Sequence, residues 1–204
     1  MIAQDVINFA VNAELKQLAV KNDIQAILGF INLGILELYK KFPLEEAEAI
    51  LWLTDGKAEY RLDGTDEDVE IDKDKELLLI FNVYDEDGEV VPLNTNELYG
   101  VNTPAYNVIE VPSIHQDEYL SVIYRVTPKF LTSITDTLPL PPQLLEPLLK
   151  YIAYKGYGSV NGGLNQETQS HYVRFEDSCN KILLEGLIQP ESIDETKFEQ
   201  RGFV

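Results

Sequence analysis

The spacing of apolar residues changes twice along this chain, and this constrains the fold more than any other feature. In residues 24–42 the apolar side chains recur every three or four positions, which is the period of a helix. From about residue 48 to residue 131 they alternate, as in strands, and after residue 139 the helical spacing returns. This order of helices, strands and helices predicts an α+β protein.

The N-terminal region predicts two helices. The first carries an apolar stripe that extends to Leu18. Asp23 is a suitable N-cap for the second helix, and Pro43 ends it. The second helix is apolar on two faces, so we expect it to be buried or to lie between two partners. Gly29 and Gly34 lower its helix propensity by about 1 kcal/mol each, which suggests close backbone approach to a neighbouring element.

The middle of the chain predicts short strands joined by turns. The strand-like runs are 50–54, 58–62, 77–84, 89–93, 106–111 and 119–126. Asp55-Gly56 is a hairpin signal between the first two runs. Residues 63–75 form an acidic connection. Strands of this length and spacing indicate a small sandwich or barrel.

Two more helices are predicted after Pro139. Pro147 lies in the first turn of the earlier helix or causes a kink there. Gly156 and Gly158, with the glycine-rich residues 161–163, are expected to stop it. The last helix runs from about residue 165 to residue 185, and its apolar stripe consists of Thr168, Tyr172, Phe175, Cys179 and Ile182.

These elements predict an α+β fold with three parts. The N- and C-terminal helix pairs, in residues 1–44 and 138–187, form a four-helix bundle that buries each amphipathic face. Residues 45–137 form an inserted, small antiparallel β domain. Residues 188–204 lose all periodicity and are expected to be an extended C-terminal tail.

The net charge of −19 is unevenly distributed. Residues 45–118 contain 21 acidic and 4 basic residues, whereas the rest of the chain contains 14 acidic and 12 basic residues. This balance argues against specific nucleic-acid binding, which needs clustered lysine and arginine. No apolar run approaches the roughly 18 residues that a membrane span needs, so we expect no membrane partner. The N-terminus lacks a basic region and a cleavage site, and we expect mature structure there rather than a signal peptide.

The sequence offers few metal ligands of the soft or imidazole type. Cys179 is the single cysteine, and it joins only two histidines, which is too thin a set for a structural zinc site. Alternating acids from Asp66 to Glu76 resemble a calcium loop, but Ile71 stands where an EF-hand needs glycine. The same alternation suits a solvated edge strand. We expect no cofactor and no metal site, although whether the acidic loop binds calcium stays open.

No catalytic constellation is present. The chain has no nucleophile elbow, phosphate loop or metalloprotease helix. His171 is expected at the core edge or on the surface, and Cys179 on the apolar stripe is expected to be a buried, inert thiol. Trp52 and the tyrosines are expected in the core or as interface anchors. We therefore predict that the protein is not an enzyme.

Two segments resemble the head-to-tail adaptors, or connector proteins, of tailed bacteriophages. They are INLGILELYKKFPL, residues 31–44, and LPLPPQLLEPLLKYIAYKGYGSVNGGLNQETQSHYVRFEDSCNKI, residues 138–182. The second is similar to the closing helical hairpin of that family, in which a proline-led helix precedes a longer helix with spaced aromatics, here Tyr172 and Phe175. The β region between the helix pairs resembles the insertion of podovirus-type members.

The resemblance implies a non-enzymatic virion protein at the head–tail interface, made in the bacterial host cytoplasm. It implies a homo-oligomeric ring, expected to be a dodecamer, that joins the portal protein to tail or tail-tube proteins around the DNA channel. Which partner the strongly acidic region faces is left open by the resemblance.

The tail is the candidate docking element. It carries Ile193, Phe198, Arg201, Phe203 and Val204, which a purely solvated tail would not need. We expect it to order on the portal or an adjacent subunit, with Phe198 and Phe203 as anchors. The alternative to a docking tail is a frayed terminus with incidental apolar residues.

Three other classes of function compete with an adaptor. The charge could indicate an acidic DNA mimic that inhibits a DNA-binding protein, but mimicry should spread acids over much of the surface. A carbohydrate- or calcium-binding β module lacks a specific aromatic platform here. An enzyme is the least supported class.

Overall fold

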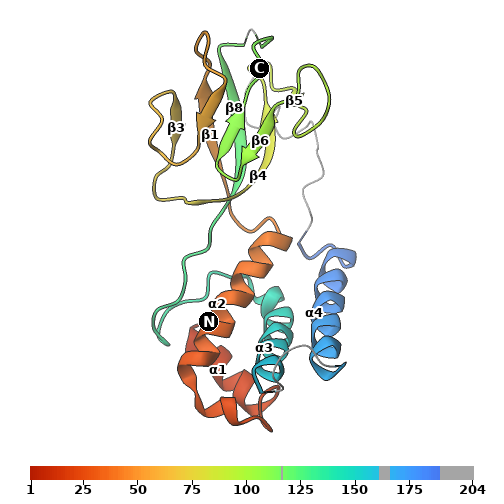
Figure 1. The fold of residues 1–204 in the computed structure, drawn as a ribbon. Helices are drawn as coiled ribbons and strands as arrows, with labels where there is room; N and C mark the ends of the chain where they lie inside the picture. The colour runs from red at the N-terminus through yellow and green to blue at the C-terminus, as the bar shows by residue number, and fades with distance from the viewer. Residues whose placement is uncertain (116, 161–165, 189–204) are drawn as a thin grey trace. The chain divides into compact units, whose positions relative to one another are not determined.

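The computed structural model describes residues 1–115, 117–160 and 166–188, which separate into two compact units (Figure 1). Residues 1–42 and 128–188 form the helical unit, and residues 43–127 form the β unit. Residues 128–137, which we assigned to the β domain from sequence, make their contacts in the helical unit. Helices and antiparallel sheets are both present, so the α+β class is confirmed.

The helical unit contains four α-helices and two 3-10 helices within the described residues. They are α1 (Ala3–Asn12), η1 (Ala19–Asn22), α2 (Ile24–Lys41), η2 (Pro142–Leu144), α3 (Leu145–Val160) and α4 (Gln166–Leu184). Helix α3 contacts each of the other three α-helices. These contacts do not by themselves define a closed four-helix bundle, which stays a prediction. None of the helices in the described ranges is long and apolar enough to cross a membrane.

Helix α2 begins where the sequence predicts. The side chain of Asp23 accepts a hydrogen bond from the backbone nitrogen of Ala26, which satisfies one of the donors left open at a helix start. Helix α1, in contrast, ends at Asn12, so the prediction of a helix that continues to Leu18 was wrong. Leu15 and Leu18 are still buried, because the chain turns after α1 and packs Leu15 against α3.

The glycines of the helices have different roles. A Cβ on Gly34 would lie 2.6 Å from Leu148 Cδ1, which confirms the predicted close approach there. At Gly29 nothing lies within 4 Å, so the same prediction was wrong at that position. Gly156 does not stop α3 as predicted, because it lies buried inside the helix, with Leu15 Cδ2 only 2.5 Å from where a Cβ would be.

Helix α4 packs one face against α3. Its buried residues are Thr168, His171, Phe175, Cys179 and Ile182. His171 therefore takes the position that we predicted for Tyr172, which is 41% exposed. A helix has 3.6 residues per turn, so spacings of 4-3 and 3-4 place a stripe almost equally well, and the packing against α3 decides between them.

The β unit holds eight strands within the described residues. They are β1 (Glu46–Trp52), β2 (Glu59–Arg61), β3 (Val69–Ile71), β4 (Leu77–Tyr84), β5 (Val90–Val91), β6 (Asn102–Ala105), β7 (Val108–Glu110) and β8 (Tyr119–Val126). The sheet content is larger than the sequence predicted, since β3 and β6 lie outside the predicted runs. Strand β3 forms an edge within the acidic segment, as one interpretation of its alternating acids allowed.

The strands form two antiparallel sheets that share one core. The first has the order β3-β1-β8-β4-β5 and the second β2-β7-β6. The Asp55-Gly56 turn exists, with Gly56 at a φ of 79°, but β1 and β2 do not pair as a hairpin. They lie in different sheets, and both send apolar side chains, such as Leu51 and Tyr60, into the shared core.

Strand β4 departs from simple alternation. Its register against β8 shifts between Leu77 and Leu79 and again between Ile80 and Asn82. Such bulges insert an extra residue and change which side chains face the core. The buried residues of β4 are consequently Leu77, Ile80 and Val83, three residues apart rather than two.

Candidate interaction surfaces

The docking residues predicted from the sequence lie outside the described part of the chain. They are Ile193, Phe198, Arg201, Phe203 and Val204. The tail hypothesis is therefore untested by the structure. The described residues contain polar and aromatic clusters of their own.

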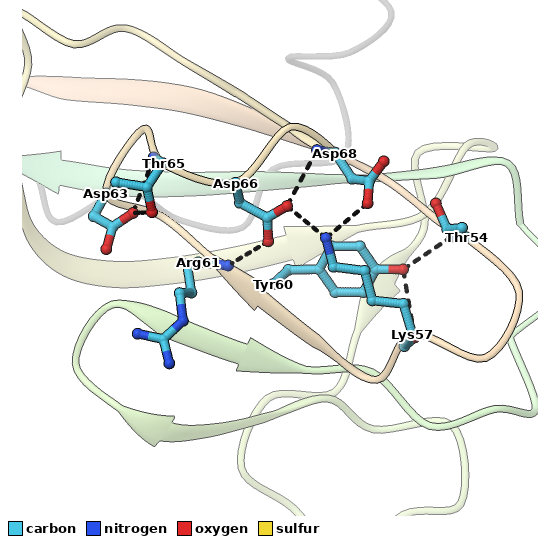
Figure 2. A network of polar contacts seen from close by, with 8 residues as sticks. All are labelled: Thr54, Lys57, Tyr60, Arg61, Asp63, Thr65, Asp66 and Asp68. Atoms are coloured by element: carbon cyan, nitrogen blue, oxygen red, sulfur yellow. Dashed lines mark hydrogen bonds and ion pairs between the residues drawn. The ribbon is translucent and has the colours of Figure 1, made fainter.

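A polar cluster of the β unit is centred on Lys57 (Figure 2). The turn after β1 carries Lys57, and its ammonium Nζ lies 2.5 Å from Asp66 Oδ1 and 2.7 Å from Asp68 Oδ2. The same ammonium lies 4.7 Å from the centroid of the Tyr60 ring. Asp66 also accepts hydrogen bonds from the backbone nitrogens of Arg61 and Asp68, each at 3.1 Å. The cluster ties the β1–β2 connection to the loop before β3.

The electrostatics of this cluster are those of a paired charge. Burial alone would lower the pKa of Lys57, but hydrogen bonds and attraction from Asp66 and Asp68 raise it above its ordinary value. Burial would raise the pKa of Asp66, yet the hydrogen bond from Lys57 and those from backbone nitrogens lower it. These two carboxylates of the predicted calcium-like segment therefore bind an ammonium. Among the described residues, no group of three or more histidines, cysteines and acids could hold a metal.

A second polar contact lies beside a cleft of about 220 Å³ in the β unit, lined by residues that include Tyr60, Lys57 and His115. The Nε2 of His115 donates to the backbone oxygen of Tyr99 at 2.8 Å, and its Nδ1 lies 2.9 Å from Asp117 Oδ2. Both ring nitrogens are thus engaged in linking the loop at Tyr99 to the segment before β8. The charged and imidazole groups of the cleft brace loops, which is a structural role.

Aromatic side chains form the principal cluster between α3 and α4. The ring centroids of Tyr151 and Phe175 are 5.1 Å apart, and those of Tyr154 and Tyr172 are 5.2 Å apart. Lys41 of α2 pairs with Glu176 at 2.8 Å beside these rings. A hydrogen bond to Glu176, assisted by burial, raises the pKa of Tyr172 to about 12. The cluster therefore joins α2, α3 and α4, with Tyr151 buried in the core and Tyr172 41% exposed at its margin.

The two candidate reactive groups of α4 are both structural in their surroundings. Burial raises the pKa of the Cys179 thiol to about 12, so the inert thiol predicted from sequence lies in the expected place. The His171 ring stacks on Tyr157 with centroids 4.2 Å apart and is 9% exposed, at the edge of the core. Burial, assisted by Arg174, lowers its pKa, which favours the neutral imidazole.

Sequence reasoning did not single out Lys57, Tyr60 or His115. The role of each depends on partners that only the tertiary fold brings close. One sequence signal was available for Lys57: it is one of only four basic residues in the acidic region, so a pairing role could have been inferred.

The helical hairpin of α3 and α4, and a β unit whose polar clusters brace its loops, together define an α+β protein. Residues 1–192 match the family described as SU10 adaptor protein. The match spans most of the 204 residues, and the chain belongs to this family. Membership supports a structural role as a phage head–tail adaptor. A search of curated proteins returned no significant match.

Proposed function

We propose that this chain is a structural virion protein that forms a ring between the portal of the capsid and the tail, around the DNA channel. The observation that carries the proposal is the family match over residues 1–192. The resemblance of residues 138–182 to the adaptor hairpin points the same way, since these residues include α3 and the described length of α4 up to Ile182.

The distribution of charge supports an adaptor over a DNA mimic. A mimic needs acids spread at phosphate-like spacing over much of its surface, whereas the acids here concentrate in the β unit. If that unit borders the channel, its charge repels phosphates and lets DNA slide. Binding of the purified protein to DNA that strengthens as salt falls would contradict this part of the proposal.

The test of the ring is electron microscopy of the purified chain mixed with the portal protein of the same phage. We expect rings stacked coaxially on one face of the portal. A chain that stays monomeric and does not bind to the portal would overturn the adaptor function. Deletion of residues 190–204 tests the tail, because weaker portal binding is expected if Phe198 and Phe203 fill pockets. Unchanged portal binding and particle assembly would remove the tail from the mechanism.

A further inference from the structure

The five-stranded sheet has a second face, opposite its core face, that carries apolar side chains beside polar ones. The register places together side chains that lie directly opposite one another, so Ile50 and Tyr84 share a face with Ser121, and Trp52 shares it with Tyr119. The apolar members of this outer face are Ile50, Trp52, Leu79, Phe81, Tyr84, Val90, Tyr119 and Ile123. All of them are half-buried or exposed.

An antiparallel sheet that meets water on one side normally alternates apolar residues toward the core and polar residues outward. The outer face breaks that rule in part, because each of the three central strands, β1, β8 and β4, places apolar side chains there beside polar ones. Trp52, Leu79 and Val90 are 43%, 47% and 45% exposed, and the Trp52 and Tyr119 rings lie tilted by 57° with centroids 5.5 Å apart. Exposed apolar side chains that gather on one face of a chain often mark an interaction site.

The charges around this face indicate the chemistry of its partner. Glu48 and Glu70 lie on the same face and are exposed, and Arg125, the base among them, is only 8% exposed. Of the other bases in the β unit, Lys57 is held by two aspartates and Lys75 pairs with Glu45 at 3.6 Å. Arg61 and Lys73 are exposed but lie outside the strands of this sheet. A second copy of the same face would therefore bring acid against acid, which is unfavourable.

We propose that the outer face, with Trp52, Leu79 and Val90 at its accessible points, is a docking surface for a different virion protein whose contact has an apolar centre and a lysine- or arginine-rich rim. The choice of a virion partner rests on the proposed adaptor function. The apolar side chains supply burial, and the acids at the β3 and β1 edge select the basic partner and orient it.

The test measures binding of the full chain to the portal and tail proteins of the same phage, each purified separately. Leu79→Lys and Val90→Lys place a charge in the face, and we expect either to weaken binding to one of these proteins at least tenfold. Leu98→Lys is the matched control, because Leu98 is 70% exposed and lies outside the sheets. All three residues are exposed, and circular dichroism checks that each variant folds.

The charge requirement has its own pair of variants. Glu70→Lys should weaken the same binding and reduce its dependence on salt, whereas Glu59→Lys, at an exposed position on β2 of the other sheet, should leave both unchanged. If the wild-type chain binds a portal or tail protein and the Leu79→Lys and Val90→Lys variants bind it equally well, the docking surface is overturned but the adaptor function is not. Loss of self-association in those variants, with portal and tail binding intact, would also overturn it, because the occupant would then be a second copy. Wild type that binds neither portal nor tail proteins would overturn the proposed function itself.

Discussion

Gly34 of α2 and Leu148 of α3 approach so closely that a Cβ on Gly34 would lie 2.6 Å from Leu148 Cδ1. The Tyr151 ring lies behind, 3.1 Å from the same point. Leu148 is fully buried and Tyr151 nearly so, which leaves neither side chain room to move. This contact lets the α2 and α3 backbones pack closely.

Replacement of Gly34 by alanine should therefore destabilise the helical unit. Alanine gains about 1 kcal/mol of helix propensity, but overpacking of a well-packed core costs about 1–3 kcal/mol. Gly29→Ala is the matched control in the same helix, and it should stabilise, since nothing lies within 4 Å of its Cβ. Urea unfolding followed by circular dichroism should place the two variants about 1–3 kcal/mol apart. Equal stabilisation by both would show that the helices can separate without loss.

The Lys57 cluster should make the β unit sensitive to acid. The pKa of Asp66 is lowered in the folded state, so its stabilisation is present above the unfolded pKa of about 3.9 and is lost as pH falls through the folded pKa. Lys57→Met should lower the free energy of unfolding at pH 7 by about 1–3 kcal/mol and flatten its decrease below pH 4. Unfolding titrations from pH 2 to pH 7 measure both effects. Lys73→Met, at an exposed lysine, is the control. If the Lys57→Met variant matches wild type at every pH, the Lys57 cluster does not stabilise the β unit.

Cys179 should resist thiol reagents in the folded protein. Burial raises its pKa to about 12, so almost no thiolate exists at pH 8, and the residue is only 2% exposed. Iodoacetamide should modify it only after denaturant is added. In a Cys179→Ala background, Asn180→Cys places a thiol at the neighbouring exposed position, and that thiol should react quickly. Rapid modification of native Cys179 would mean that α4 opens from α3.

Asn32 should hold the segment that leads from the β unit back to α3. Its side-chain nitrogen donates to the Leu131 backbone oxygen at 2.9 Å, and its oxygen accepts from the Leu131 backbone nitrogen at 2.8 Å. Asn32→Ala leaves both backbone groups unpaired and should cost about 1–3 kcal/mol. We expect faster tryptic cleavage after the exposed Lys129. Asn8→Ala, which removes an exposed contact within α1, should leave the cleavage rate unchanged.

Local signals in the sequence predicted the helices best where capping and proline define them. Asp23 caps α2, and Pro147 lies in the first turn of α3, because both effects act within a few residues along the chain. The buried position of Cys179 also followed from helical period alone. The candidate docking tail, residues 188–204, stays a prediction.

Other features depended on contacts between distant parts of the chain. Local propensity marks Gly156 as a helix stop, but α3 continues through it. Leu15 packs into the space that a side chain at this position would fill. Alternation along β4 predicts core residues two apart, whereas two bulges against β8 make them three apart.

The sequence by itself determined the order of helices and strands, the α+β class and the concentration of acid in one region, because each depends on composition and local period. Only the tertiary structure decided which strands pair, that β1 and β2 belong to different sheets, and that Lys57 meets Asp66 and Asp68. It also decided that β1, β4 and β8 carry apolar residues on both faces. Strand register and ion pairing are set by the partner segment, and nothing in the local sequence of one strand specifies its neighbour.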